Sequence, residues 1–342
     1  MKKLIHCHNA SMPWAHNPRQ IFEYGLSLGV AASKMLDAAN LDASDLKNAE
    51  LSISWPQYRS LVAEVDRKAP DAWGFFLGAS LHAASHGMLS LLLLNCISWK
   101  QMMESVGRYG LLISPLVYMR KRESAEYVSL TAYPEFVDGE LLPQFLLMYL
   151  TSVYQTMVEV GGIDFRNNPE KMCVLMPGEP PAAEAEMRSF FHENVRWGSY
   201  GYQLRIHKDI VNSDIDSPDP RAASSTLQIL HSQLAQLPGR KGYMRELGSL
   251  FARGCYRLED CAKALHCSGP TLKRYLRQSS TTFSAQLRRF RLDEACWQLQ
   301  ETDASTAEIA NQLGFEDTGS FRRMFREGLG LSPQEYRAQS ER

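Results

Sequence analysis

Residues 258–276 read LEDCAKALHCSGPTLKRYL, and residues 306–325 read TAEIANQLGFEDTGSFRRMF. Each stretch holds an apolar helical pattern, then a short turn, then a second helix whose outer face is basic. The same unit therefore occurs twice in the C-terminal part of the chain. Two such units in tandem predict a region that reads DNA.

The first unit has a continuous apolar face. Leu258, Cys261, Ala262 and Leu265 are spaced as i, i+3, i+4 and i+7, so they lie on one side of a helix. The small residues in that set allow a second helix to approach closely. Residues 267–269 are predicted to form the turn to that second helix.

The second helix of this unit is predicted to be well capped and basic. Ser268 can accept a hydrogen bond from the first turn, and Pro270 stands where a missing N–H does no harm. Leu272 and Leu276 then face inward. The outward face carries three cations and no acid: Lys273, Arg274 and Arg277.

The second unit follows the same plan. Ser305 and Glu308 have the spacing of a capping box, and Gly314 starts the turn. The apolar stripe of its first helix consists of Ile309, Ala310 and Leu313. The following helix is predicted to bury Phe321 and Phe325 and to expose Arg322, Arg323 and Arg326.

A single helix over residues 282–301 is predicted to join the two units. Its roughly 20 residues would span about 30 Å at 1.5 Å per residue. One turn of DNA measures about 34 Å, so the two basic helices would enter successive segments of the major groove on one face of a duplex. Ser332 and Glu335 form another capping box, which starts a last helix.

A lone helix-turn-helix pattern with a few arginines is more often an ordinary solvated helical pair than a DNA reader. Here the pattern occurs twice, each copy has a basic second helix, and the spacer has the length of one DNA turn. These features together favour double-stranded DNA as the partner of the tail.

Composition leaves room for two domains in this chain of 342 residues and 38.7 kDa. The formal net charge of -1 excludes a strongly basic protein of the histone type. The charges are unevenly distributed, because residues 241–342 carry 16 Lys and Arg against 13 Asp and Glu, whereas the preceding residues carry 21 against 25. The tail is therefore mildly basic and the front mildly acidic.

Cysteine usage and hydropathy predict a cytoplasmic chain without a membrane span. The seven cysteines are an odd number without a CxxC pair. The N-terminus lacks the apolar centre of a signal peptide. The apolar run at 88–97 is about half as long as a membrane helix needs, and Pro143 interrupts the run at 141–154.

We predict an α+β N-terminal sensor domain plus an all-α C-terminal domain with two helix-turn-helix units. The predicted boundaries place the sensor at 1–215, a connector with a helix (222–237) at 216–242 and the seven-helix DNA-binding domain at 243–342, with its units at about 258–278 and 306–327. The predicted sensor helices are 21–36, 54–68, 98–112, 141–160 and 181–192. The predicted sensor strands are 114–119, 126–133, 172–176 and 201–206. The charged residues 120–123 are predicted to turn between the first two strands.

Over about residues 258–337 the tail resembles the DNA-binding domain of AraC/XylS-type transcription regulators. The residues that carry the resemblance are Arg291-Leu-Asp-Glu-Ala295, Ile309-Ala310, Leu313-Gly314-Phe315, Ser320-Phe321, Arg323, Phe325, Gly330, Ser332-Pro333 and Tyr336-Arg337. The family's usual pattern differs here at Gly269-Pro270 and at Ser280, so direct base reading in the first unit depends on Lys273 and Arg274.

The resemblance implies residue roles and partners. Base or groove contacts would come from Pro270, Thr271, Lys273 and Arg274 in the first unit and from Thr318, Gly319, Arg322 and Arg323 in the second. Arg277 would contact phosphate. The family also implies contact with RNA polymerase, a homodimer and an activator role.

The front of the chain resembles the "arabinose-binding" domain of one AraC-type subgroup. The residues that carry this resemblance include Gly87-Met-Leu-Ser90, Ile97-Ser98, Gly107-Arg108-Tyr109, Met176-Pro177 and Val195-Arg196-Trp197. It implies a module that senses a small-molecule effector and dimerises, and it does not identify the effector. An alternative is a front domain that makes only protein contacts.

Other chemistry has weaker support. Ser80 with His82 and Ser85 with His86 lack a GxSxG elbow, so we predict no enzyme. Residues 6–8 (His-Cys-His) are too close together to converge on one ion, and we predict neither a metal nor a cofactor.

Two further patterns leave alternatives open. Cys255, Cys261 and Cys267 recur every six residues and suggest a thiol sensor, but a buried cysteine is usually inert. A group of aromatic and methionine residues would form either part of the core or an apolar effector pocket. The group consists of residues 73–76, Met102, Met103, Phe145 and Met148. Such a pocket would suit an apolar or amphipathic ligand.

Overall fold

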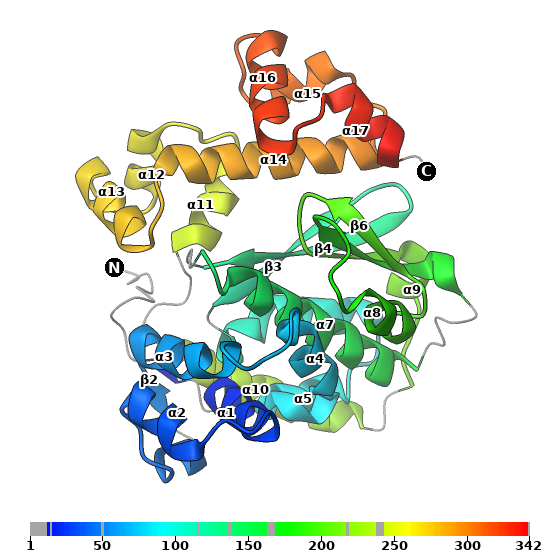
Figure 1. The fold of residues 1–342 in the computed structure, drawn as a ribbon. Coiled ribbons are helices and arrows are strands. Elements are labelled where there is room, and N and C mark those ends of the chain that lie inside the picture. Colours follow the sequence, from blue (N-terminus) through cyan, green and yellow to red (C-terminus); the bar gives the residue numbers. More distant parts are fainter. Residues whose placement is uncertain are drawn as a thin grey trace.

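The computed structural model describes residues 12–13, 16–48, 51–114, 116–135, 139–162, 168–216, 219–236 and 243–340. Its buried apolar residues form two cores. One core extends from Ile21 to Leu230, and the other from Met244 to Tyr336. Figure 1 shows the helical C-terminal region lying across one face of a sheet, with most front helices on the opposite side.

Helices make up most of the front region. They are α1 (His16–Ser27), α2 (Ala32–Ala39), α3 (Trp55–Asp66), α4 (Trp73–Ser80), α5 (Met88–Leu93), α6 (Trp99–Tyr109), α7 (Leu142–Gly161), α8 (Glu184–Phe190), α9 (Lys208–Val211) and α10 (Pro220–Gln236). Short 3₁₀ turns include η1 (Asp45–Lys47), η2 (Ala83–His86), η3 (Gly110–Leu112) and η4 (Pro169–Lys171). Helix α10 packs against α5, and its Ala223 and Leu230 belong to the front core.

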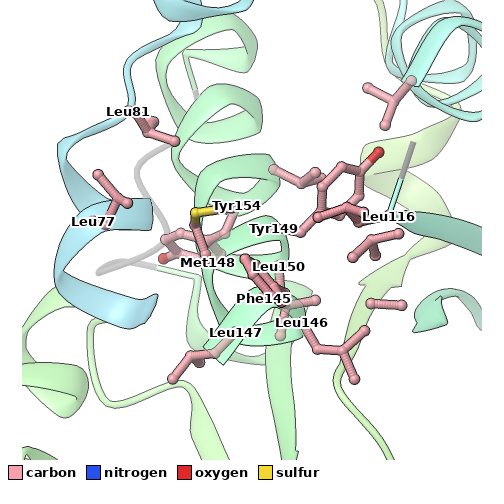
Figure 2. Packing of buried hydrophobic residues seen from close by; sticks show 14 of the residues in the cluster. Leu77, Leu81, Leu116, Phe145, Leu146, Leu147, Met148, Tyr149, Leu150 and Tyr154 are labelled. Carbon is pink, nitrogen blue, oxygen red and sulfur yellow. The ribbon is translucent and has the colours of Figure 1, made fainter. Parts of the chain in front are cut away.

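Helix α7 runs through the centre of the front region. Helix α4 lies against it at very close range because two glycines face it. A Cβ atom on Gly74 would lie 2.1 Å from the carbonyl oxygen of Gln144, and one on Gly78 would lie 2.5 Å from that of Met148. Figure 2 shows the apolar side chains that fill this contact. Any larger residue at either glycine would force the two helices apart.

A five-stranded sheet completes the front region. Its strands are β3 (Val117–Glu123), β4 (Tyr127–Pro134), β5 (Met172–Pro177), β6 (Val195–Ser199) and β7 (Gln203–His207), arranged in the order β3-β4-β7-β5-β6. Neighbouring strands are antiparallel except for β5 and β6. A separate short pair joins β1 (Met12–Pro13) to β2 (Ser52–Ile53).

The predicted mixture of helices and strands is confirmed, with two corrections. The helix predicted over 21–36 is wrong as one element, because the chain breaks between α1 and α2 and Gly29 adopts a left-handed φ of 75°. The charged turn predicted at 120–123 is also wrong. Those residues belong to β3, and the chain reverses before Tyr127. The patterns at 73–80, 88–93 and 195–199 were not predicted as elements.

The seven helices of the described tail are α11 (Tyr243–Phe251), α12 (Leu258–Ala264), α13 (Gly269–Gln278), α14 (Phe283–Glu301), α15 (Thr306–Gln312), α16 (Thr318–Leu329) and α17 (Pro333–Ser340). The predicted joining helix is confirmed as α14. Its buried residues point to several sides because the helix-turn-helix units cover one side and the sheet covers another (Figure 1).

Candidate nucleic-acid interface

Helices α12 and α13 form the first helix-turn-helix unit. Cys261, Ala262, Leu272 and Leu276 are buried between them, as the sequence predicts. The turn begins earlier than predicted, at His266, which has a left-handed φ of 54°. Because α13 already starts at Gly269, the predicted turn residues only partly coincide with the observed turn.

The exposed face of α13 is basic. Ser268 caps the helix, since its Oγ accepts a hydrogen bond from the amide of Thr271 at 3.3 Å. The side chains of Lys273, Arg274 and Arg277 are all exposed, and α13 contains no acidic residue. Pro270 is exposed as well. This face therefore presents three cations to solvent, which suits a phosphate backbone and base edges.

Helices α15 and α16 form the second unit. Ser305 and Glu308 make the predicted capping box, with an amide-to-carboxylate distance of 2.7 Å. Phe321 and Phe325 are fully buried. The N-cap of α16 is Asp317, whose Oδ1 accepts a hydrogen bond from the amide of Ser320 at 2.7 Å. Hydrogen bonds from the Ser320 hydroxyl and then from this amide lower the pKa of the Asp317 carboxyl.

The exposed face of α16 is basic beyond its first turn, and that first turn carries little side-chain bulk. Gly319 has no side chain, and a Cβ atom there would lie 2.9 Å from Oδ1 of Asp317. Arg322, Arg323 and Arg326 are exposed, and Thr318 is half-buried. The one acid in α16, Glu327, pairs with Arg288 on α14 at 3.2 Å. The predicted outward and inward residues of α16 are therefore where the sequence placed them.

The two units are held in a fixed relation through the turn of the second unit. Nη2 of Arg291 on α14 donates to the carbonyl of Gly314 at 3.1 Å, and its guanidinium stacks 4.3 Å from the ring of Phe315. Tyr256, just before the first unit, donates to the carbonyl of Gln312 at 3.1 Å. Arg291 therefore has a structural role, because it joins α14 to the second turn.

Helix α17 closes the tail. Ser332 and Glu335 form the predicted capping box, with distances of 2.6 and 3.2 Å. Arg337 donates to the carbonyls of Leu299 and Ala304 at 3.1 and 2.5 Å. These hydrogen bonds fix the loop between α14 and α15. The second unit is therefore held to α14 by Arg337 at this loop and by Arg291 at the turn after α15.

Two family descriptions match this chain. Residues 261–339 match a helix-turn-helix domain, and residues 29–215, more than half of the chain, match the N-terminal arabinose-binding domain of AraC transcription regulators. The chain belongs to the AraC family of transcription regulators. It is a DNA-binding regulator with a ligand-binding type of N-terminal domain, as the sequence predicts.

Individual relatives agree with the family assignment. The chain is similar to the ornithine utilization regulator of Pseudomonas aeruginosa, with 24% identity over 90% of this chain and 91% of that protein. It is 27% identical to an uncharacterized HTH-type transcriptional regulator of Mycobacterium tuberculosis over 93% and 94% of the two chains. The transcriptional activator NphR of Rhodococcus is 36% identical over 25% of each chain. These relatives are regulators and not enzymes, which agrees with the prediction of a non-enzymatic protein.

The AraC-type tail of this chain packs on the sheet through buried charges. Arg120 of β3 contacts Glu294 of α14 at 2.8 Å, and Arg122 forms an ion pair with Asp293. Tyr133 of β4 donates a hydrogen bond to the same Asp293 carboxylate. The side chains of Arg122 and Asp293 are only 5% and 7% exposed, so this contact is a desolvated ion pair between the two regions.

Two further ion pairs border this contact. Arg205 of β7 contacts Glu301 at 2.8 Å. Arg245 of α11 contacts Glu135, beyond the end of β4, at 3.4 Å. Burial raises the pKa of Glu135 to about 7, although Arg245 and the amides of α11 lower it. This interface is not among the features that the sequence predicts. Its signal was the alternation of Tyr118, Arg120 and Arg122, which places all three on one strand face.

The other predicted candidates have ordinary structural roles. His86 is buried, and its Nε2 lies 2.9 Å from the hydroxyl of Thr156, whereas His82 is exposed and pairs with Glu159. The residues 6–8 lie outside the described residues. Elsewhere, no cluster of three potential metal ligands occurs among the residues that the structure describes. No helix in the described ranges is long and apolar enough to cross a membrane.

The cysteine spacing brings two thiols together. The Sγ atoms of Cys255 and Cys261 are 3.3 Å apart. Burial, followed by contact with Cys255, raises the pKa of the Cys261 thiol, so little thiolate forms there at neutral pH. The sequence-based suggestion of a thiol sensor stays a prediction.

Proposed function

We propose that this AraC-family regulator reads two successive segments of the major groove, one with α13 and one with α16. The proposed base or groove contacts are Pro270, Thr271, Lys273 and Arg274 on α13 and Thr318, Gly319, Arg322 and Arg323 on α16. Arg277 is the proposed phosphate contact. The observation that carries the proposal is the pair of exposed cationic helices attached to one rigid helix, α14.

The spacing of the units supports simultaneous binding. Helix α14 contains 19 residues, which corresponds to about 28 Å at 1.5 Å per residue. Arg291 and Tyr256 prevent the second unit from rotating freely about this helix. A rigid pair loses less conformational freedom on binding than two tethered units would, so both helices contribute to affinity.

We further propose that the chain is cytoplasmic, acts as a homodimer and responds to a small-molecule effector. In this proposal, the effector changes how the front region holds the tail through the charged contact of β3 with α14. Occupancy of paired DNA half-sites then changes, and contact with RNA polymerase activates transcription. The activator role is supported by similarity to a relative described as an activator.

The alternative is a front domain that makes only protein contacts. A specific observation favours it, because Leu91, Leu94, Ile97 and Ile229 are 39–50% exposed on or just after the packed helices α5 and α10. Exposed apolar groups of this kind are suited to a protein partner. The two alternatives differ in whether any ligand changes DNA affinity.

The test is binding of the purified full chain to DNA upstream of its own and neighbouring genes, with and without a panel of amino acids, fatty acids and sugars. Specific binding that a ligand changes saturably supports the proposed function. Specific binding that no compound changes supports the protein-contact alternative. Absence of specific binding contradicts the groove assignment. Lys47→Ala removes an exposed cation far from the tail in sequence and serves as the charge-matched control for variants that replace an arginine of α13 or α16 by Ala.

A further inference from the structure

A cleft separates α1 from the end of α4 and the segment that follows it. Its volume is about 530 Å³, and its walls include Arg19 and Glu23 of α1 and Ser80 of α4. A second, smaller cavity of about 30 Å³ adjoins it. Gln20 and Leu81 line both spaces, so they form the boundary between the cleft and the inner cavity.

The wall of the cleft carries a fixed cation and an available carboxylate. The Nε and Nη2 atoms of Arg19 donate to the carbonyl of Leu46 at 2.8 and 2.6 Å, which fixes the guanidinium and leaves Nη1 for another acceptor. Glu23 lies one helical turn further along α1 and is exposed. Within the described part of the chain, Glu23 forms no ion pair. Opposite charges on one wall suit a ligand that carries both signs.

The inner cavity is apolar. Leu89, Val106, Met148 and Val153 contribute to its lining. Its walls also hold a polar group formed by His86, Ser152 and Thr156. These side chains bond to one another, with Nε2 of His86 at 2.9 Å from Oγ1 of Thr156 and 3.3 Å from Oγ of Ser152.

The shape of the boundary limits what can enter the inner cavity. Figure 2 shows Leu77 and Leu81 facing the side of α7 that carries Met148. Gln20 closes the passage with a single hydrogen bond, from its Nε2 to the carbonyl of Ser85 at 3.2 Å. A space of about 30 Å³ holds about two water-sized groups, so a branched aliphatic side chain fits only when Gln20 moves aside and its volume is added to the cavity.

We propose that this cleft binds a small zwitterion with a short apolar side chain, of which an aliphatic α-amino acid is the simplest case. The carboxylate of the ligand contacts Arg19, its ammonium group contacts Glu23, and its side chain displaces Gln20 and enters the inner cavity. This inference rests on the proposed function, because the ligand would be the effector of the regulator.

The position of the cavity connects it to the DNA-binding region. Ile113 and Ser114 line it, and β3 begins three residues after Ser114. The carbonyl of Leu116, just before this strand, accepts a hydrogen bond from the amide of Glu135 at 2.8 Å. Glu135 in turn contacts Arg245 of α11, and Arg120 and Arg122 of β3 contact α14. A shift of this segment on ligand binding would therefore act on both contacts with the tail.

The first test measures ligand binding calorimetrically with the full chain and no DNA. The probes are L-leucine, 3-methylbutylamine, which lacks its carboxylate, and 4-methylpentanoate, which lacks its ammonium group. The proposal expects saturable binding of L-leucine and at least tenfold weaker binding of each analogue, since each loses one charged contact. Undetectable binding of L-leucine at millimolar concentration, or equal binding of all three compounds, would overturn it.

A pair of variants tests the location. Glu23→Gln is expected to weaken L-leucine binding at least tenfold, whereas Glu186→Gln, an exposed acid on α8, is expected to leave it unchanged. Val106→Phe is expected to block the inner cavity and so to weaken L-leucine more than glycine. If Val106→Phe does not fold, the location of the site is decided by Glu23→Gln alone. Glu23 is exposed, so its replacement is expected to leave the fold intact. Unchanged binding in Glu23→Gln would contradict the site.

Failure of the site and failure of the proposed function have different signatures. DNA affinity is measured separately on the same protein preparations. L-leucine binding that depends on Glu23 supports the site even if DNA affinity does not respond, and that result contradicts the effector role in the proposed function. Ligand-responsive DNA binding with no effect of Glu23→Gln preserves the proposed function and overturns the site.

Discussion

Two basic stretches of this chain look alike in the sequence and differ in the fold. Arg120 and Arg122 lie on β3 against α14, where two acidic residues neutralise them. Arg274 and Arg277 lie exposed on α13, in a helix without an acid. Burial and local charge partners therefore decide which arginines join the two regions and which are available to DNA.

The largest effect is expected for Arg122→Ala. This change leaves Asp293 buried without its main cation and is expected to destabilise the full chain by about 3–5 kcal/mol. Lys121→Ala is the matched control, since Lys121 is exposed on the same strand and pairs with Glu123 at the surface. Its expected loss in the free energy of unfolding is below about 1 kcal/mol. Chemical denaturation measures both free energies of unfolding, and equal losses would show that burial against α14 does not decide the cost of removing a cation from β3.

The pH dependence of stability tests the interface at Glu135. The pKa of this carboxyl rises from 4.5 to about 7 on folding, because burial disfavours its charge. The folded chain therefore holds a proton that the unfolded chain releases between these values. This contribution is fully present below about pH 4.5 and is lost as the pH rises to about 7. At about 1.4 kcal/mol per pKa unit it amounts to roughly 3 kcal/mol.

The variant that isolates this contribution is Glu135→Gln. It is expected to flatten the decline in the free energy of unfolding between pH 5 and 7.5, because an amide does not titrate. Glu140→Gln, an exposed carboxyl near the same segment, is the control and is expected to keep the decline. A profile for Glu135→Gln that matches the parent chain would show that Glu135 is not the group responsible.

A smaller effect is expected for the exposed arginines of α16. Replacing the base-reading member of Arg322 and Arg323 by Ala is expected to cost about 1–3 kcal/mol of DNA affinity and to relax preference at one base position. Stability is expected to change little, since both side chains are exposed. Binding to a set of single-base operator variants measures the preference. Equal losses on every sequence would place both residues on the backbone instead of in the groove.

The smallest effect is expected for Arg277→Ala. Loss of one phosphate contact is expected to weaken binding on all sequences alike and to reduce the salt slope of log K by about 1. Titrations at several salt concentrations measure that slope. A changed base preference in this variant would instead indicate that Arg277 reads a base.

Local patterns were sufficient for the tail but not for the front region. The caps at Ser268, Ser305 and Ser332 and the buried faces of α12, α13, α15 and α16 depend on residues three or four positions apart, so periodicity predicts them. The cap at Asp317 was missed although the residue type is typical. In the front region, α4 and α5 are apolar on most sides, and such helices have no clear period.

The sequence by itself determined the two helix-turn-helix units, the caps at Ser268 and Ser305, the basic faces and the joining helix, because these depend on short-range spacing. Only the tertiary structure decided that Arg120 and Arg122 pair with acids about 170 positions away in the chain. It also decided that Arg291 fixes a turn and that Arg19 and Glu23 border a cleft. Charged residues look equally solvated in a sequence, and their energetic role depends on which distant side chains remove them from water.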